Sequence, residues 1–158
     1  MAGKRGFSGG DEAGDGVIIP GRLRTLVVDD NTYARAICGM SLQKLGVGEV
    51  VEAANGAEAI LQLMGQPFHF MLMDWYMPDI NGAGLMQVLR DARFGAPTQM
   101  PVILMTAYVS RDNLARARRL GVNEILPKPF TTEQLGTAMG RILAAEVPEA
   151  PDGGAVFL

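Results

Sequence analysis

The chain has 158 residues, of which 48% are hydrophobic and 20% charged, with a net charge of −3 and a pI near 5.1. This balance fits one soluble domain with a sizeable core, and the acidic charge gives no electrostatic case for binding nucleic acid or a membrane surface. The single cysteine, Cys38, excludes an internal disulfide, and no signal-peptide pattern or apolar run of ~20 residues is present, so we expect a cytoplasmic protein.

The two ends of the chain differ in composition from its middle. Residues 1–22 are rich in glycine, mixed in charge and without periodicity, which predicts a flexible leader. Residues 147–158 predict a short flexible tail. One domain is therefore expected over residues 23–146.

Strand-like and helix-like segments alternate through this middle region. The predicted strands are continuous apolar runs at 25–29, 49–54, 69–74, 101–106 and 123–127. The predicted helices span 32–45, 56–64, 82–93, 111–120 and 131–145. Continuous apolar strands are typical of a parallel sheet covered on both faces, so five strand–helix units predict an α/β doubly wound fold.

Four of the five predicted helices carry an apolar stripe. The exception is the helix predicted at 111–120, which is rich in arginine. The stripes are Ala34, Cys38, Leu42 and Leu45; Ala57, Ile60, Leu61 and Met64; Leu85, Val88, Leu89 and Ala92; and Leu135, Ala138, Met139 and Ile142. We expect these faces to cover the sheet.

Four of the five predicted strands end at a polar residue. Asp29 and Asp30 end the first strand, Asp74 the third, Thr106 the fourth, and Lys128 follows the fifth. Because the carboxyl ends of parallel strands meet at one edge, these side chains should converge in one cleft.

The chemistry of this set favours phosphoryl transfer. Three carboxylates without a histidine or thiolate suit a hard cation such as Mg²⁺, with Mn²⁺ as an alternative. A carboxylate beside such a cation can attack a phosphoryl group and form an acyl phosphate, while Thr106 and Lys128 share the charge on the phosphoryl oxygens. The only histidine, His69, opens the third strand away from this edge, so a phosphohistidine donor must come from another protein.

Each residue also has an ordinary structural interpretation. Asp30 or Thr106 alone could simply begin a helix, and Lys128 could be a solvated turn residue. Five such residues at one sheet edge favour a functional site over this interpretation.

The motifs "VVDDN", "FMLMDWYMPDINGAGLMQVLR", "PVILMTAY" and "ILPKPF" resemble the receiver domain of two-component response regulators, over residues 24 to about 145. The resemblance implies a flavodoxin-like (βα)5 fold with strand order 2-1-3-4-5. It also implies a sensor histidine kinase or histidine phosphotransfer protein as partner, with the oligomeric state left open between a monomer and a dimer promoted by phosphorylation.

The same resemblance assigns roles to the site residues. Asp74 would be the phosphoacceptor, Asp30 the main metal-binding acid, Asp29 its support, and the backbone carbonyl of Tyr76 a further metal ligand. Thr106 would be the switch hydroxyl. Lys128 would pair with the phosphoryl group, and the Lys128–Pro129 bond would be cis.

Three features depart from the family pattern. Ile125 stands where many receivers carry a switch Tyr or Phe. Tyr76 and Tyr108 each follow a site residue by two positions, and we hypothesise that their rings restrict the attacking water and prolong the phosphorylated state; alternatively, both cover the cleft or dock a partner. Pro127 removes a strand donor, which an edge strand tolerates.

We expect no output domain after the last predicted helix, and we therefore expect the chain to signal by protein contact or to relay phosphate. A candidate partner face joins Ile125 to four arginines of the fourth helix, namely Arg111, Arg116, Arg118 and Arg119. The downstream target is unknown. Three alternatives are a docking module that acts without phosphorylation, an aspartyl phosphatase of the haloacid-dehalogenase type, and a flavin carrier of the same fold.

Overall fold

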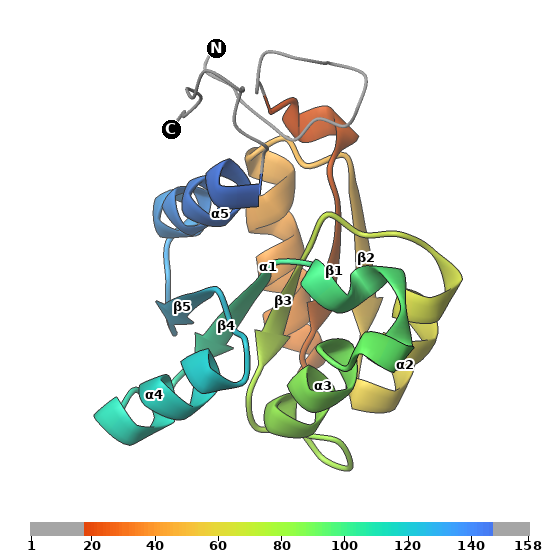
Figure 1. Cartoon of the computed structure of the whole chain (residues 1–158). Helices are drawn as coiled ribbons and strands as arrows, with labels where there is room; N and C mark the ends of the chain where they lie inside the picture. The colour runs from red at the N-terminus through yellow and green to blue at the C-terminus, as the bar shows by residue number, and fades with distance from the viewer. Residues whose placement is uncertain (1–17, 147–158) are drawn as a thin grey trace, which may run out of the picture.

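The computed structural model describes residues 18–146, which form a five-stranded sheet between two layers of helices (Figure 1). Residues 1–17 and 147–158 lie outside the described residues, so the expected leader and tail stay predictions there. Residues 18–22, expected in the leader, carry structure: Pro20–Arg22 form a short 3-10 helix (η1), and Ile18 is buried against core residues. No helix within residues 18–146 is long and apolar enough to cross a membrane.

The sheet is parallel throughout and has the predicted topology. Its strands are β1 (Arg24–Val28), β2 (Glu49–Ala53), β3 (Phe70–Asp74), β4 (Val102–Thr106) and β5 (Glu124–Pro127). Their spatial order is β2-β1-β3-β4-β5, which confirms the doubly wound α/β fold and the 2-1-3-4-5 order. The chain changes direction across the sheet between β1 and β3, so a crevice opens at the carboxyl ends of these two strands.

Five helices follow the strands, and each of them begins at a side-chain cap. They are α1 (Thr32–Lys44), α2 (Gly56–Gly65), α3 (Gly82–Leu89), α4 (Arg111–Arg119) and α5 (Thr132–Glu146). The capping oxygens that accept from a first-turn N–H belong to Asn31, Asn55, Asn81, Ser110 and Thr131. Each cap follows the carboxyl end of a strand and satisfies a backbone donor that the helix leaves open. The caps therefore fix where each helix begins beside the crevice.

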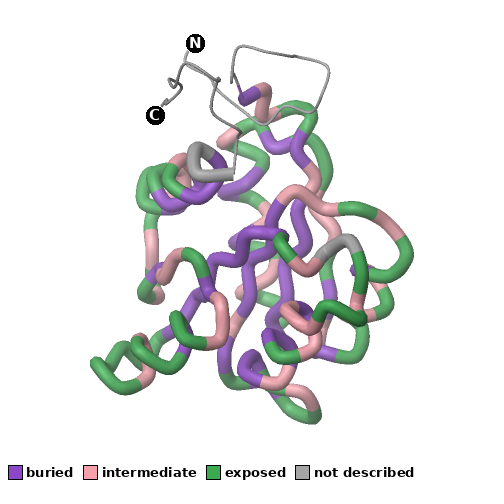
Figure 2. The backbone as a smooth tube through the Cα atoms, in the orientation of Figure 1, coloured by how far each residue is buried: buried purple, intermediate pink, exposed green. Residues whose placement is uncertain are grey.

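The two faces of the sheet bury separate apolar clusters. One cluster joins α1 and α5 to one face, through residues such as Leu42 and Leu135. The other joins α2, α3 and α4 to the opposite face, through residues such as Leu63, Leu85 and Ala117. Buried backbone runs through the central strands (Figure 2). With helices on both faces, successive side chains of β1, β3 and β4 all find apolar partners, which explains their unbroken apolar runs.

The predicted stripe on α2 is wrong at three of its four positions, and only Ile60 packs against the core. Leu61 and Met64 are 70% and 69% exposed, whereas Ala59 and Leu63 are buried. Gly56 decides the helix rotation, because a Cβ there would lie 2.7 Å from Cβ of Ile80. The face that begins with Gly56 must therefore turn inward, and the larger residues beside it turn outward.

The predicted helix 82–93 is too long. The helix α3 ends at Leu89, and Asp91 adopts an extended conformation and accepts a hydrogen bond from Arg93 N–H at 2.9 Å. This local side-chain bond competes with the next helical turn. The chain continues through two short 3-10 helices, η2 (Ala92–Phe94) and η3 (Ala96–Gln99), before β4.

Candidate functional site

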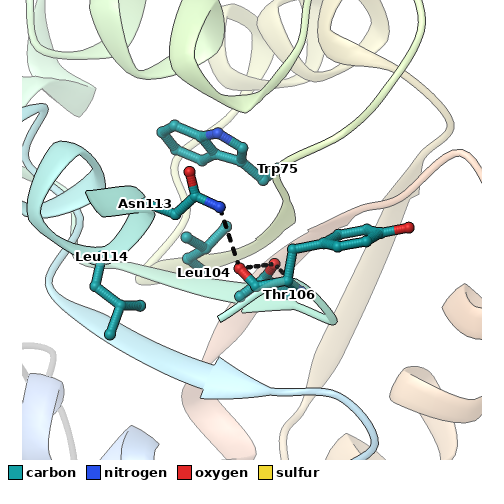
Figure 3. A pocket seen from close by; sticks show the side chains of 6 residues that line it. Trp75, Leu104, Thr106, Asn113 and Leu114 are labelled. Atoms are coloured by element: carbon teal, nitrogen blue, oxygen red, sulfur yellow. Dashed lines mark hydrogen bonds between the residues drawn. The ribbon is translucent and has the colours of Figure 1, made fainter. Parts of the chain in front are cut away.

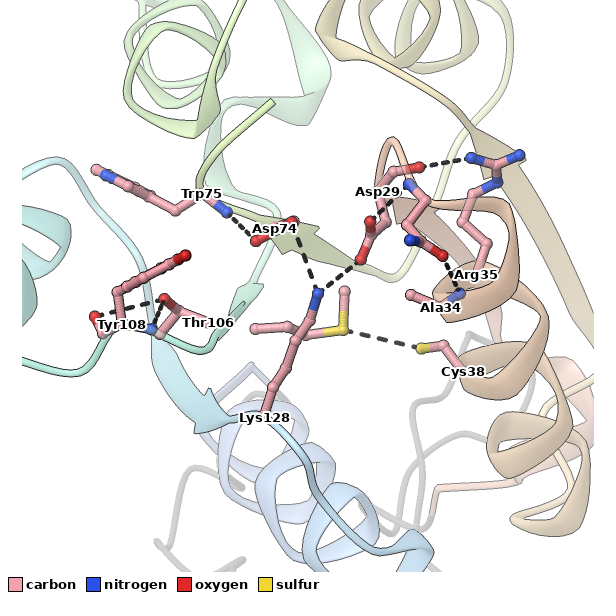
Figure 4. Close-up of polar contacts among 11 residues, drawn as sticks. Asp29, Ala34, Arg35, Cys38, Asp74, Trp75, Thr106, Tyr108 and Lys128 are labelled. Carbon is pink, nitrogen blue, oxygen red and sulfur yellow. Dashed lines mark hydrogen bonds and ion pairs between the residues drawn. The ribbon is translucent and has the colours of Figure 1, made fainter. Parts of the chain in front are cut away.

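The polar residues that end the strands lie together at the carboxyl edge of the sheet (Figure 4). Lys128 Nζ lies 2.8 Å from Asp29 Oδ2 and 3.6 Å from Asp74 Oδ2, so residues that follow β1, end β3 and follow β5 meet in one cluster. Asp30 lies with them, because one carboxylate oxygen from each of the three aspartates falls within 4.8 Å of the others. The convergence expected from strand ends alone is therefore present for all three acids and the lysine.

The three carboxylates differ in exposure. Asp29 is buried, Asp74 is partly buried and Asp30 is exposed. Such a set offers hard oxygen ligands on the protein side and leaves an open side for water, which is the environment that Mg²⁺ prefers. The repulsion among three nearby acids also favours a cation there. The donor set thus fits Mg²⁺, and Asp29, Asp30 and Asp74 are the residues that could hold it.

Each of the other charged residues of the cluster affects the pKa of Asp74. Burial raises the pKa of Asp74 above its ordinary value, and the nearby acids Asp29 and Asp30 add to the rise. Lys128 and the Trp75 N–H, which donates to Asp74 Oδ1 at 2.8 Å, oppose it. A carboxylate that is poorly stabilised by its surroundings gains from any cation that approaches it.

Lys128 is held by both its side chain and its backbone. Burial alone would lower the pKa of Lys128, but its bond to Asp29 and the charge of Asp74 raise it overall, so the ammonium stays charged. Its N–H donates to the Thr106 carbonyl at 2.8 Å, directly after Pro127, which has no N–H to give. The Lys128–Pro129 bond is cis. The lysine is thus positioned from β5 toward the acids of β1 and β3.

Thr106 is buried at the end of β4, and its hydroxyl is engaged within its own loop. Thr106 Oγ1 accepts from Tyr108 N–H at 2.9 Å (Figure 4). The same residue lines a small pocket with five others, shown in Figure 3. The remaining lining residues are Trp75, Leu104, Tyr108, Asn113 and Leu114. The hydroxyl therefore lies beside the acid cluster but is hydrogen-bonded away from it.

Tyr76 and Tyr108 meet at the rim of the site. Their rings lie edge to face, with centroids 5.1 Å apart and an interplanar angle of 83°. Both side chains are largely exposed. Asn113 of α4 makes long contacts to both residues, 3.5 Å to the Tyr76 hydroxyl and 3.4 Å to the Tyr108 carbonyl. The pair bridges the loop after β3 and the loop after β4.

The residues of the candidate partner face lie apart from the acid cluster. The four arginines are exposed on α4, and none of them forms an ion pair with another described residue: Arg111, Arg116, Arg118 and Arg119. Ile125 is half-buried on β5 and packs against the core cluster of α2, α3 and α4. These five residues therefore do not contribute to the metal-binding chemistry.

Sequence reasoning did not identify two residues that hold the first acid. Asn31 N–H donates to Asp29 Oδ1 at 2.9 Å, and Arg35 Nη1 donates to the Asp29 carbonyl. Arg35 also pairs with Glu52 at the end of β2, 2.9 Å away. The sequence did contain a signal for them. Arg35 is a cationic residue in the first turn of the helix that follows the two aspartates, and residues 31 and 35 share one helix face.

Comparisons with known proteins agree with this geometry. The sequence profile of the response regulator receiver domain matches residues 25–139. The chain is 30% identical over 124 residues to a probable chemotaxis protein CheY from Rhizobium etli, covering 78% of this chain and 95% of that protein. It is 34% identical over 121 residues to the chemotaxis protein CheY from Pseudomonas aeruginosa, covering 76% and 95%.

Solved structures show the same fold. Vibrio cholerae chemotaxis protein CheY4 superposes with a TM-score of 0.71 at 27% identity, covering 77% of this chain and 98% of that one. The receiver domain of sensor histidine kinase PA1611 from Pseudomonas aeruginosa, solved with a magnesium ion coordinated in its active-site cleft, gives a TM-score of 0.70 at 25% identity, covering 77% and 97%. The chain belongs to the response regulator receiver family.

Proposed function

We propose that the chain accepts a phosphoryl group on Asp74 from a phosphohistidine of a partner protein, and signals by phosphorylation-dependent contacts or by passing the phosphoryl group along a relay. The observation that carries this proposal is the Asp74 carboxylate itself. It ends β3 with the Lys128 ammonium 3.6 Å away and two further acids beside it. A sensor histidine kinase or a histidine phosphotransfer protein is the proposed donor. The only histidine of the chain, His69, adjoins the amino-terminal end of β3, where its Nδ1 accepts from Arg24 N–H.

The reaction forms one bond and breaks one. A carboxylate oxygen of Asp74 bonds to phosphorus as the phosphorus–nitrogen bond of the donor breaks, and the imidazole leaves with that electron pair. Lys128 offsets the charge on the phosphoryl oxygens, and Thr106 donates its hydroxyl to one of them after leaving its bond with Tyr108 N–H. Bound Mg²⁺, or Mn²⁺ in its place, would neutralise further charge on those oxygens. Its proposed ligands are the carboxylates of Asp29, Asp30 and Asp74 and the backbone carbonyl of Tyr76.

Intact mass after incubation with acetyl phosphate and Mg²⁺ tests the proposal. We expect one added phosphoryl group that is absent with EDTA and absent in Asp74→Asn. A protein that binds Mg²⁺ yet gives no adduct and binds no beryllofluoride would contradict it. That result would favour the docking module that acts without phosphorylation.

We also propose that Tyr76 and Tyr108 slow the loss of the phosphoryl group. Two large rings in contact over the rim leave less room for a water in line with the new bond. In the same mass experiment, after acetyl phosphate is removed, Tyr76→Asn with Tyr108→Ala should lose the adduct several-fold faster. An unchanged rate would assign the rings to covering the cleft or to docking a partner.

The output would pass through α4 and its neighbours. When Thr106 moves toward the phosphoryl group, the loop that carries Tyr108 and leads into α4 must move with it. The four arginines of α4 offer a docking patch for an acidic partner there. We propose a cytoplasmic protein, since its buried free thiol, Cys38, fits a reducing compartment, and either a monomer or a dimer promoted by phosphorylation.

A further inference from the structure

The peptide that joins Asp29 to Asp30 is restrained far more on one side than on the other. Asp29 is held at both carboxylate oxygens, by Asn31 N–H and by Lys128, each within 2.9 Å. Its N–H donates to the Ala53 carbonyl of β2 at 3.2 Å. The Asp30 side chain, by contrast, is exposed and makes no hydrogen bond or ion pair with the described residues. Where Asp30 points is therefore set by the backbone that carries it.

Arg35 fixes that backbone. Arg35 Nη1 donates to the Asp29 carbonyl at 2.6 Å, a short bond to the peptide group that leads into Asp30. Its side chain is only 12% exposed, so this bond is largely shielded from water. Figure 4 shows the guanidinium reaching from α1 over the loop after β1.

The negative charge of Glu52 offsets the positive charge of Arg35, which would otherwise repel a metal ion bound nearby. Arg35 Nε lies 2.9 Å from Glu52 Oε1, and Glu52 belongs to β2, in register with Val27 of β1. The pair offsets the guanidinium charge and anchors it to the sheet. Arg35 therefore spans from Glu52 to the Asp29 carbonyl with two of its donors, whose relative direction is fixed in a planar guanidinium and not in a flexible lysine side chain.

We propose that Arg35 is a positioning residue for the divalent cation: it holds the Asp29–Asp30 peptide so that the Asp30 carboxylate is oriented for metal before metal arrives. This inference rests on the proposed function of the acid cluster. It differs from a stabilising role because its consequence is metal affinity. Groups that orient metal ligands without touching the metal typically change affinity by about 10- to 100-fold when they are replaced.

Calorimetric titration of the full chain with MgCl₂ tests the inference. We expect the Kd for Mg²⁺ to rise about tenfold in Arg35→Gln and by a smaller factor in Arg35→Lys, which keeps the charge but loses the fork. Arg24→Gln is the matched control. Arg24 makes the same Nε–Oε1 pair at 2.9 Å with Glu49 of β2, at the opposite end of the same strands. Its replacement should leave the Kd unchanged.

The rate of phosphorylation by acetyl phosphate, measured against Mg²⁺ concentration, separates positioning from general damage. In Arg35→Gln the half-saturating Mg²⁺ concentration should rise while the rate at saturating Mg²⁺ stays close to that of the unchanged protein. A lower maximal rate with unchanged half-saturation would overturn the inference, as would an unchanged or lower Kd in Arg35→Gln. If the unchanged protein itself fails to bind Mg²⁺, the metal requirement of the proposed function falls as well. If the unchanged protein binds Mg²⁺ and is phosphorylated, and Arg35→Gln binds Mg²⁺ with the same Kd, only the role of Arg35 is overturned.

Discussion

The adjacent acids Asp29 and Asp30 have different surroundings, which explains why two like charges can share one strand end. Asp29 is buried with a lysine and a backbone N–H on its two oxygens, so its charge is compensated by the chain itself. Asp30 faces outward, where water lowers the cost of its charge. The sequence predicted both residues in the site from their place after a strand. It could not show their different environments, because the burial of Asp29 and its pairing with Lys128, which lies far along the chain, depend on the fold.

Asp74 gives the site a pH dependence that can be measured without phosphorylation. Because its pKa is raised in the folded protein, mainly by burial, the ionised carboxylate destabilises the fold above that pKa. Asp74→Asn should therefore unfold at higher urea than the unchanged protein at neutral pH in EDTA. The advantage should shrink as the pH falls through the raised pKa and end near the ordinary carboxyl value of about 4, where both states bind the proton. A gain that grows as the pH falls would contradict this assignment.

At the scale of the elements, local signals predicted the type of each segment, and tertiary contacts set the details. Five strands and five helices were predictable because their apolar runs and caps are local. The rotation of α2 was not, since it depends on Ile80 from another loop pressing on Gly56. The hydrogen bond that Thr106 Oγ1 accepts from Tyr108 N–H was not predictable either, because a position at the end of a strand does not show which partner a hydroxyl bonds.

Gly82 is the tightest link between α3 and the site. A Cβ at this position would lie 2.8 Å from Trp75 Cε3 and 2.9 Å from Trp75 Cα. Gly82→Ala should therefore lower the free energy of unfolding by about 2 kcal/mol, the usual cost of overpacking a fixed backbone. Gly39→Ala in α1 is the control, since nothing lies within 4 Å of its Cβ position, and it should raise the same quantity by about 0.5 kcal/mol or more. Urea unfolding measures both changes. An unchanged free energy of unfolding in Gly82→Ala would show that the loop after β3 shifts to accommodate the added methyl group.

At the scale of the whole molecule, one guanidinium links α3 to two strands at the amino-terminal edge of the sheet. Arg90, just after α3, donates to the carbonyls of Thr98 and Met100 before β4, and to the carbonyl of Gly121 and the Asn123 side chain before β5. It thus connects the end of α3 to the segments that lead into β4 and β5. Buried carbonyls without a donor are costly, so this side chain satisfies what the turns cannot.

Replacing Arg90 should weaken the fold without touching the acid cluster. Arg90→Met keeps most of the stem but removes four donated bonds, and we expect the free energy of unfolding to fall by about 2 kcal/mol. Arg93→Met serves as the control, because its only side-chain partner within residues 18–146, Asp91, is a neighbour on an exposed turn. Thermal and urea unfolding should leave the control unchanged, and an equally stable Arg90→Met would show that water replaces the lost donors.

The two edge strands have a consequence for behaviour at high concentration. The strand β5 has four residues and ends in Pro127, which offers no amide to an incoming strand, and β2 exposes Glu49 and Glu52 along the opposite border. Short length, proline and charge are the features by which natural sheets resist edge-to-edge growth. Fibrils that extend this sheet should therefore form poorly in crowded solution, and self-association should depend on helical surfaces, where salt can weaken it and phosphorylation can control it.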